Sequence, residues 1–201
     1  NYILYKGLKR CGADVDYRIP DRIADGYGIN EHLIDQAYED GVDTVITCDN
    51  GIAAAEQIAY GNRLGMTFVV TDHHDVPFVE EENAHREILP EAAAVINPKQ
   101  ESCSYPFKQI CGAVVAFKFV QILYELSGVS PQETEEFLEI TRTPSHSFTD
   151  LDGKRSFYCL NHNAYLSMSA RALTGKTGFT GKAGYCYVGA LKDGERTFIA
   201  V

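Results

Sequence analysis

Apolar residues recur along the first two thirds of the chain with two spacings, which predict alternating helices and strands. Apolar positions three and four apart predict helices over residues 2–10, 31–40, 52–64 and 111–126. Short apolar or alternating runs predict strands over residues 13–19, 44–48, 67–71 and 92–96, and the run at 44–48 is typical of a strand buried on both faces. Strands that alternate with helices are typical of a parallel sheet, so we expect an α/β fold.

The pattern changes in the last third of the chain. Residues 185–191 and 197–201 are predicted as strands separated by glycine turns, without helical crossovers. Residues 1–138 contain 10 Lys and Arg against 23 Asp and Glu, whereas residues 139–201 contain 8 against 5. These changes predict a parallel-sheet domain over residues 1–138 and a small β-rich segment over residues 139–201, with a boundary near residues 138–144.

Composition bears on the cellular compartment of the protein and on its ability to bind DNA. The six cysteines include no CxxC pair, a pattern typical of a reducing cytosol, and we expect a cytoplasmic protein without a membrane segment. The chain opens at Asn1 instead of Met, directly before a segment with the pattern of the end of a helix, so we interpret the N-terminus as a cut. The acidic first part counts against non-specific DNA binding, because such binding depends on neutralising phosphates.

Acidic and imidazole side chains follow two of the predicted strands. Asp49 follows the run TVITC, and Asp72, His73 and His74 follow the run FVVT. Parallel strands end at one edge of a sheet, where ligands gather, so these side chains are expected to lie close together. Carboxylates and neutral imidazoles suit Mn²⁺, and two such ions could support phosphodiester hydrolysis. By itself, however, Asp-Asn-Gly is commonly only a turn.

Five segments occur in the order and spacing of one known family: YRIPDRIADGYGIN, TVITCDNGI, VVTDHHDVP, AVINPK and CGAVVAFKF. With them the first part of the chain resembles the RecJ-type single-strand-specific exonucleases of the DHH phosphoesterase family. The resemblance implies a Mn²⁺- or Mg²⁺-dependent 5′-to-3′ exonuclease acting on single-stranded DNA. It implies that Asp49, His73 and His74 contact the metals and that Asp72 supports the site.

The resemblance also singles out a loop next to the active site, with Arg22, Tyr27 and Gly28 as candidate substrate-binding residues. An equally favoured interpretation of these residues is a tight turn between a strand and a helix. The family's Asp-x-Asp strand would lie upstream of Asn1, and its last metal-binding Asp is not matched. We therefore expect weak metal binding and weak or no activity. We also expect residues 13–19 and 44–48 to close up, or to be partly disordered, where the first strand is missing.

The end of the chain resembles a different family. The segment TGKTGFTGKAGYCYVGA is similar to penicillin-binding D-alanyl-D-alanine carboxypeptidases, with Lys176, Thr177 and Gly178 as their KTG element. The alternative interpretation of KTG is a glycine-turn hairpin with a surface lysine. No serine is followed three residues later by lysine, so the nucleophile of those enzymes is not supplied. A serine-type carboxypeptidase and a chimeric remnant without function are the alternatives to the nuclease hypothesis.

Overall fold

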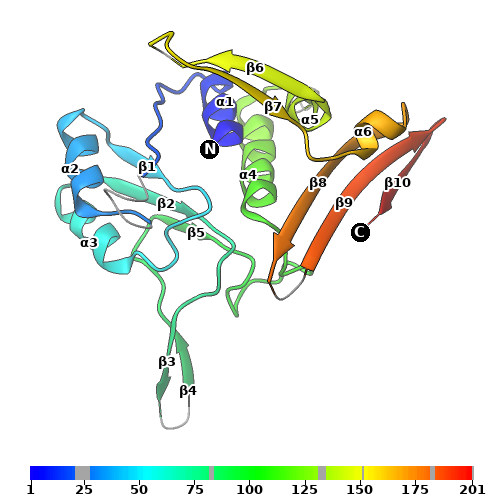
Figure 1. Cartoon of the computed structure of the whole chain (residues 1–201). Helices are drawn as coiled ribbons and strands as arrows, with labels where there is room; N and C mark the ends of the chain where they lie inside the picture. The colour runs from blue at the N-terminus through cyan, green and yellow to red at the C-terminus, as the bar shows by residue number, and fades with distance from the viewer. Residues whose placement is uncertain (21–27, 82–83, 131–134, 151, 182–183, 201) are drawn as a thin grey trace. The chain divides into compact units, whose positions relative to one another are not determined.

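The computed structural model describes residues 1–201 except 21–27, 82–83, 131–134, 151, 182–183 and 201. The chain divides into two compact units, Asn1–Ser130 and Pro131–Val201 (Figure 1). The assignment of residues 1–138 and 139–201 to two domains stays a proposal. Among the helices that the structure describes, none combines the length and the apolar character that a membrane crossing needs.

The first unit is built around a parallel sheet. Its elements are α1 (Tyr2–Arg10), α2 (Glu31–Glu39), β1 (Thr44–Ile46), α3 (Ala55–Arg63), β2 (Thr67–Thr71), β3 (Phe78–Glu81), β4 (Ala84–Glu87), β5 (Ala94–Ile96) and α4 (Gly112–Ser127). β1, β2 and β5 are parallel and lie in that order, which confirms the predicted α/β fold. The connection from β2 to β5 contains the antiparallel hairpin β3–β4 instead of a helix (Figure 1).

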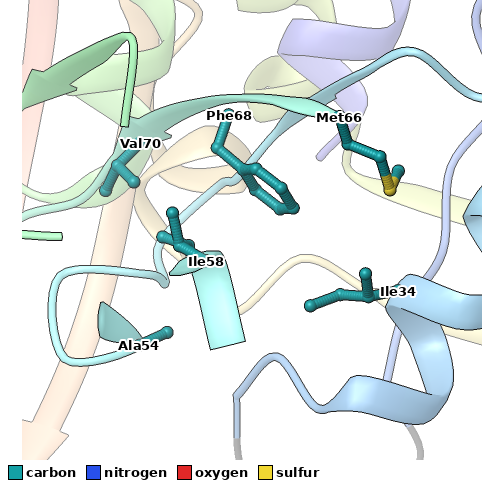
Figure 2. Close-up of a cluster of buried hydrophobic side chains, with 6 residues drawn as sticks. All are labelled: Ile34, Ala54, Ile58, Met66, Phe68 and Val70. Atoms are coloured by element: carbon teal, nitrogen blue, oxygen red, sulfur yellow. The ribbon is translucent and has the colours of Figure 1, made fainter. Parts of the chain in front are cut away.

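The main core of this unit lies between β2 and the helices α2 and α3. It contains Ile34, Ala54, Ile58, Met66, Phe68 and Val70 (Figure 2). Ile58, Phe68 and Val70 are fully buried, and burying a side chain of this size contributes about 1.5–3 kcal/mol. A Cβ added at Gly61 would overlap the Phe68 ring, so glycine lets α3 lie directly on β2.

A second contact joins α1 to α4. A Cβ at Gly7 of α1 would lie 2.6 Å from both methyl carbons of the fully buried Val120 of α4. The absence of a side chain at Gly7 therefore allows the two helices to approach closely. α4 also contacts β2, which connects this helix pair to the sheet.

The predicted strand over residues 13–19 is wrong. This segment has no regular secondary structure, and Tyr17 and Ile19 are 55% and 66% exposed. Its side chains are held instead by a ring contact between Tyr5 and Tyr17 and by an ion pair from Arg18 to Asp40. Alternating apolar residues make a strand only beside a hydrogen-bonding neighbour, and no strand in the described part of the chain pairs with this segment.

For residues 13–19 and 44–48 we expect closing up or partial disorder, and of these two outcomes the structure does not show closing up of residues 13–19 against β1. Within the described residues, β1 pairs with β2 alone, and no strand from the second unit joins this sheet. β1 is therefore an edge strand here, with Thr44 exposed and Val45 and Ile46 half-buried. The expectation of a strand buried on both faces is wrong, because none of these three residues is fully buried.

The second unit confirms the predicted β-rich segment. Its elements are α5 (Glu135–Arg142), β6 (Ser145–Thr149), β7 (Ser156–Leu160), α6 (Tyr165–Met168), β8 (Ala172–Thr180), β9 (Gly184–Asp193) and β10 (Arg196–Ala200). β6 and β7 form one antiparallel hairpin, and β8, β9 and β10 form an antiparallel sheet in the order β10-β9-β8. Every described residue of β6, β7 and β10 is exposed.

Candidate metal centre

The parallel register brings the ends of β1 and β2 together. Ile46 is aligned with Val69, and the hydrogen bonding continues past the last residue of β1. The backbone N–H of Thr47 donates to the carbonyl of Val69 at 2.9 Å, and that of Asp49 donates to the carbonyl of Thr71 at 3.0 Å. Asp49 therefore lies beside the residue that precedes Asp72.

A tight turn follows β1 and aims the side chain of Asp49. Asp49 has a φ of 62°, a left-handed conformation that aspartate tolerates better than most residues. The hydroxyl of Thr47 donates to the carbonyl of Asn50 at 2.6 Å and accepts from the N–H of Thr71 at 3.2 Å. The turn predicted from Asp-Asn-Gly is present, and it leaves the carboxylate of Asp49 free to act as a ligand.

Asp72 is a buried carboxylate that organises the second strand end. Its Oδ1 accepts from the N–H of His73 at 2.7 Å, the N–H of His74 at 3.2 Å and the ring Nδ1 of His74 at 2.7 Å. Its Oδ2 accepts from the N–H of Ile52 at 3.0 Å. Burial by itself would raise the pKa of Asp72, but these four hydrogen bonds outweigh it and hold the pKa below its usual value.

The bond from Ile52 also explains where α3 begins. The sequence predicts a helix from residue 52, but α3 starts at Ala55. Ile52 is buried, and its N–H is engaged by the carboxylate of Asp72. Residues 52–54 therefore belong to the turn between β1 and α3, which the bond from Ile52 ties to Asp72.

Asp49, His73 and His74 form a group that could hold a metal ion. One potential ligand atom from each residue lies within 4.8 Å of the others. Nε2 of His73 is 2.9 Å from Oδ1 of Asp49. Nδ1 of His74 is engaged by Asp72, which leaves Nε2 of His74 for an ion.

This geometry fits a divalent ion. Two ligands each about 2.1 Å from one ion and at right angles to each other lie about 3 Å apart. The 2.9 Å separation between Asp49 and His73 agrees with that spacing. A set of one carboxylate and two imidazoles suits an ion that accepts both oxygen and nitrogen, as Mn²⁺ does.

Sequence reasoning missed Asn97, which lies directly after β5 and is 2% exposed. Its Nδ2 donates to the carbonyl of His74 at 2.9 Å, and its Oδ1 accepts from the N–H of Lys99 at 2.9 Å. Asn97 thereby fastens the turn containing His74 to the neighbouring strand. The segment AVINPK held the signal, because it places an amide side chain at the end of a strand.

The loop residues predicted to bind substrate are described only in part. Arg22 and Tyr27 fall outside the described residues. Gly28 has a φ of 100°, and a Cβ there would lie 3.6 Å from Oδ1 of Asn50, so the end of that loop borders the turn after β1.

Lys176, Thr177 and Gly178 lie on β8 in the second unit. Lys176 is exposed, and its Nζ donates to the carbonyl of Thr177. The segment is therefore part of an antiparallel sheet, paired with β9.

Known proteins match the part of the chain that contains the candidate metal centre. The model of the DHH family, N-terminal domain, matches residues 1–143. The chain belongs to the DHH family. This membership confirms the family resemblance seen in the segments around Asp49 and around Asp72, His73 and His74.

Among DHH proteins, the chain is similar to the RecJ exonucleases. It is 38% identical over 131 residues to the single-stranded-DNA-specific exonuclease RecJ of Bacillus subtilis, which covers 65% of this chain and 15% of that protein. It is 37% identical over 105 residues to RecJ of Escherichia coli, which covers 52% of this chain and 17% of that protein. The chain thus spans less than a fifth of the length of either relative.

Solved structures give a similar result. A crystal structure of exonuclease RecJ bound to manganese is 29% identical and matches with a TM-score of 0.53, covering 66% of this chain and 31% of that one. A D-alanyl-D-alanine carboxypeptidase from Mycobacterium tuberculosis matches 43% of this chain and 28% of that one, at 27% identity and a TM-score of 0.30.

Proposed function

We propose that this chain provides a metal-binding edge of a phosphoesterase that hydrolyses phosphodiester bonds in single-stranded DNA. The proposal is carried by the convergence of Asp49, His73 and His74 at the ends of two parallel strands. The relatives are named single-stranded-DNA-specific exonucleases, and the similar crystal structure is described as bound to manganese. Those names support single-stranded DNA as the substrate and Mn²⁺ as the ion.

Four side chains at this edge have different roles: three are proposed as metal ligands and one as their support. Asp49 offers a carboxylate oxygen to the ion, and His73 and His74 each offer a ring nitrogen. Asp72 is not a ligand, because both its oxygens already accept hydrogen bonds; it fixes the ring of His74 instead. A bound divalent ion would polarise a phosphoryl oxygen and lower the pKa of a coordinated water.

The choice of ion follows from the donor atoms. Mg²⁺ prefers oxygen ligands and keeps much of its water, whereas imidazole nitrogen is a better ligand for later divalent ions. Two of the three donors here are imidazoles. We therefore propose Mn²⁺ in preference to Mg²⁺.

Weak binding and slow cleavage are expected of the 201-residue chain. Three protein ligands occupy half of an octahedral shell, so Mn²⁺ is held less tightly than in a site with more carboxylates. The acidic charge of residues 1–138 also repels DNA phosphates. Arg22, Tyr27 and Gly28 are proposed to face the substrate, which the position of Gly28 beside Asn50 supports.

The first test is Mn²⁺ binding measured by titration calorimetry. We expect one saturable site, which Asp49→Asn or His73→Gln weakens at least about tenfold, as the loss of a ligand should. His32→Gln is the matched control, because His32 is an exposed imidazole on α2 whose Nε2 lies 3.2 Å from Nε2 of Gln36, away from the candidate metal centre.

The second test is cleavage of 5′-labelled single-stranded DNA with Mn²⁺. We expect slow cleavage that Asp49→Asn abolishes. Binding of Mn²⁺ that is equal in the wild-type chain and in Asp49→Asn would overturn the proposed site. Fast cleavage by the chain as it stands would overturn the claim that three ligands hold the ion weakly.

A further inference from the structure

The first turn of α4 lies directly against the carboxylate of Asp49. A Cβ built on Gly112, the first residue of α4, would lie 2.5 Å from Oδ1 of Asp49, 2.9 Å from Cγ and 3.0 Å from Cβ. Real Cβ atoms essentially never approach another heavy atom within 3.0 Å. The side chain of Asp49 therefore occupies the space that any other residue at position 112 would need.

Backbone conformation does not require glycine at this position. Gly112 is not among the glycines with a positive φ, so an L-residue could adopt its backbone. Alanine is also the better helix former, by up to about 1 kcal/mol in a helix interior. The contact with Asp49 is the feature of the described structure that requires a residue without a side chain.

The same oxygen of Asp49 faces two neighbours. Its Oδ1 is the atom nearest to the missing Cβ of Gly112, and it is also the atom 2.9 Å from Nε2 of His73. The backbone of Asp49 is fixed by its φ of 62° and by its bond to Thr71, but these leave the carboxylate free to rotate. In the orientation that the structure shows, the carboxylate lies in the space left by the missing side chain of Gly112, with Oδ1 toward His73.

We propose that Gly112 is a positioning residue for Asp49: its missing side chain forms a notch in which α4 supports the carboxylate and directs it toward His73. This inference rests on the proposed function, because it treats Asp49 as a metal ligand. Gly112 does not itself touch the ion. It acts through the orientation of Asp49.

A side chain at position 112 is expected to change the orientation of the Asp49 carboxylate more than it changes the stability of the chain. The side chain of Asp49 is 58% exposed, so it can swing into solvent when a methyl group takes its place. Gly7 provides the opposite case, because a methyl group there meets the fully buried Val120, which has nowhere to move. Gly112→Ala is therefore expected to affect mainly Mn²⁺ binding, and Gly7→Ala mainly the stability of the chain.

The experiment uses the complete chain and compares Gly112→Ala with Gly7→Ala. Mn²⁺ affinity is measured by titration calorimetry, and Tm is measured in EDTA. Gly112→Ala is expected to weaken Mn²⁺ binding at least tenfold while Tm changes by only a few degrees. Gly7→Ala is expected to lower Tm clearly and to leave Mn²⁺ affinity unchanged in the folded protein.

A double-mutant cycle keeps the inference testable if Gly112→Ala unfolds the chain. Asp49→Gly removes the side chain that fills the notch and tolerates the positive φ. The loss of Tm caused by Gly112→Ala should fall by at least half in the Asp49→Gly background. An equal loss in both backgrounds would show that Gly112 serves helix packing alone and would overturn the inference.

The remaining outcomes separate this inference from the proposed function. If the wild-type chain binds no Mn²⁺, the proposed function fails and the role of Gly112 fails with it. If the wild-type chain binds Mn²⁺ and Gly112→Ala binds it within twofold as tightly, only the role of Gly112 is overturned.

Discussion

Nδ1 of His74 lies 2.7 Å from Oδ1 of Asp72, a carboxylate that is only 1% exposed. This bond fixes the ring of His74 so that Nε2 is left for an ion, and it belongs to a set of four bonds that satisfy both oxygens of Asp72. Stability and metal binding are therefore expected to depend on the same buried group.

Asp72→Asn tests that dependence. An amide cannot accept at both terminal atoms, so at least one buried N–H loses its partner, at a cost of about 1–3 kcal/mol in the free energy of unfolding. Mn²⁺ affinity should fall by about 10–100-fold, as for other residues that orient ligands. Urea unfolding in EDTA and Mn²⁺ titration provide the measurements. Asp75→Asn is the control, because Asp75 is 93% exposed; equal effects of the two variants would contradict the prediction.

Asn97→Asp changes one atom in the support of His74. The carboxylate can still accept from the N–H of Lys99, but it no longer donates to the carbonyl of His74. We expect a loss of at least about 1 kcal/mol of stability, since the carbonyl of His74 loses its donor and the buried side chain at position 97 becomes a carboxylate, together with weaker Mn²⁺ binding. Asn62→Asp is the matched control: Nδ2 of Asn62 on α3 also donates to a carbonyl, that of Glu91, in a hydrogen bond that is exposed to solvent. Unchanged Mn²⁺ affinity in Asn97→Asp would count against the role given to Asn97.

Gly61→Ala tests the packing of α3 on β2. The added methyl group would overlap the ring of Phe68, which is fully buried and cannot move away. Overpacking of this kind typically costs about 1–3 kcal/mol, and the midpoint of urea unfolding should fall accordingly. Gly181→Ala is the control, because a Cβ there has nothing within 4 Å. A Gly61→Ala variant as stable as the wild-type chain would refute the close contact.

A chain ending at Ser130 tests whether the first unit is sufficient for the metal centre. Asp49, His73, His74 and the core around Phe68 all lie in that unit. We expect residues 1–130 to unfold cooperatively and to bind Mn²⁺ as tightly as the whole chain, measured by circular dichroism and calorimetry. Loss of Mn²⁺ binding in a folded fragment would place a necessary group in the second unit.

Labelling with a fluorescent penicillin tests the KTG segment on β8. No serine in the sequence is followed three residues later by lysine, so the KTG segment lacks the nucleophile on which an acyl-enzyme would form. We expect no covalent label, with an active penicillin-binding carboxypeptidase labelled in parallel as the positive control. A stoichiometric adduct would instead support the serine-peptidase alternative.

The sequence by itself determined most of the elements and the convergence at the strand ends. The helix over residues 2–10 and the strand over residues 67–71 were predicted with the bounds that the structure has. Asp49 and the histidines at 73 and 74 were predicted to meet because parallel strands end at one edge, and they do lie together. Local patterns suffice for such features because periodicity and strand direction are encoded within a few neighbouring residues.

Only the tertiary structure decided which groups satisfy one another across the chain. The alternating residues 13–19 carry a strand pattern, yet they form no strand because no neighbour in the described structure pairs with them. The bond from Asn97 to His74 and the notch at Gly112 likewise join residues more than twenty positions apart. Such relationships depend on which elements become neighbours after folding, and sequence spacing does not specify that.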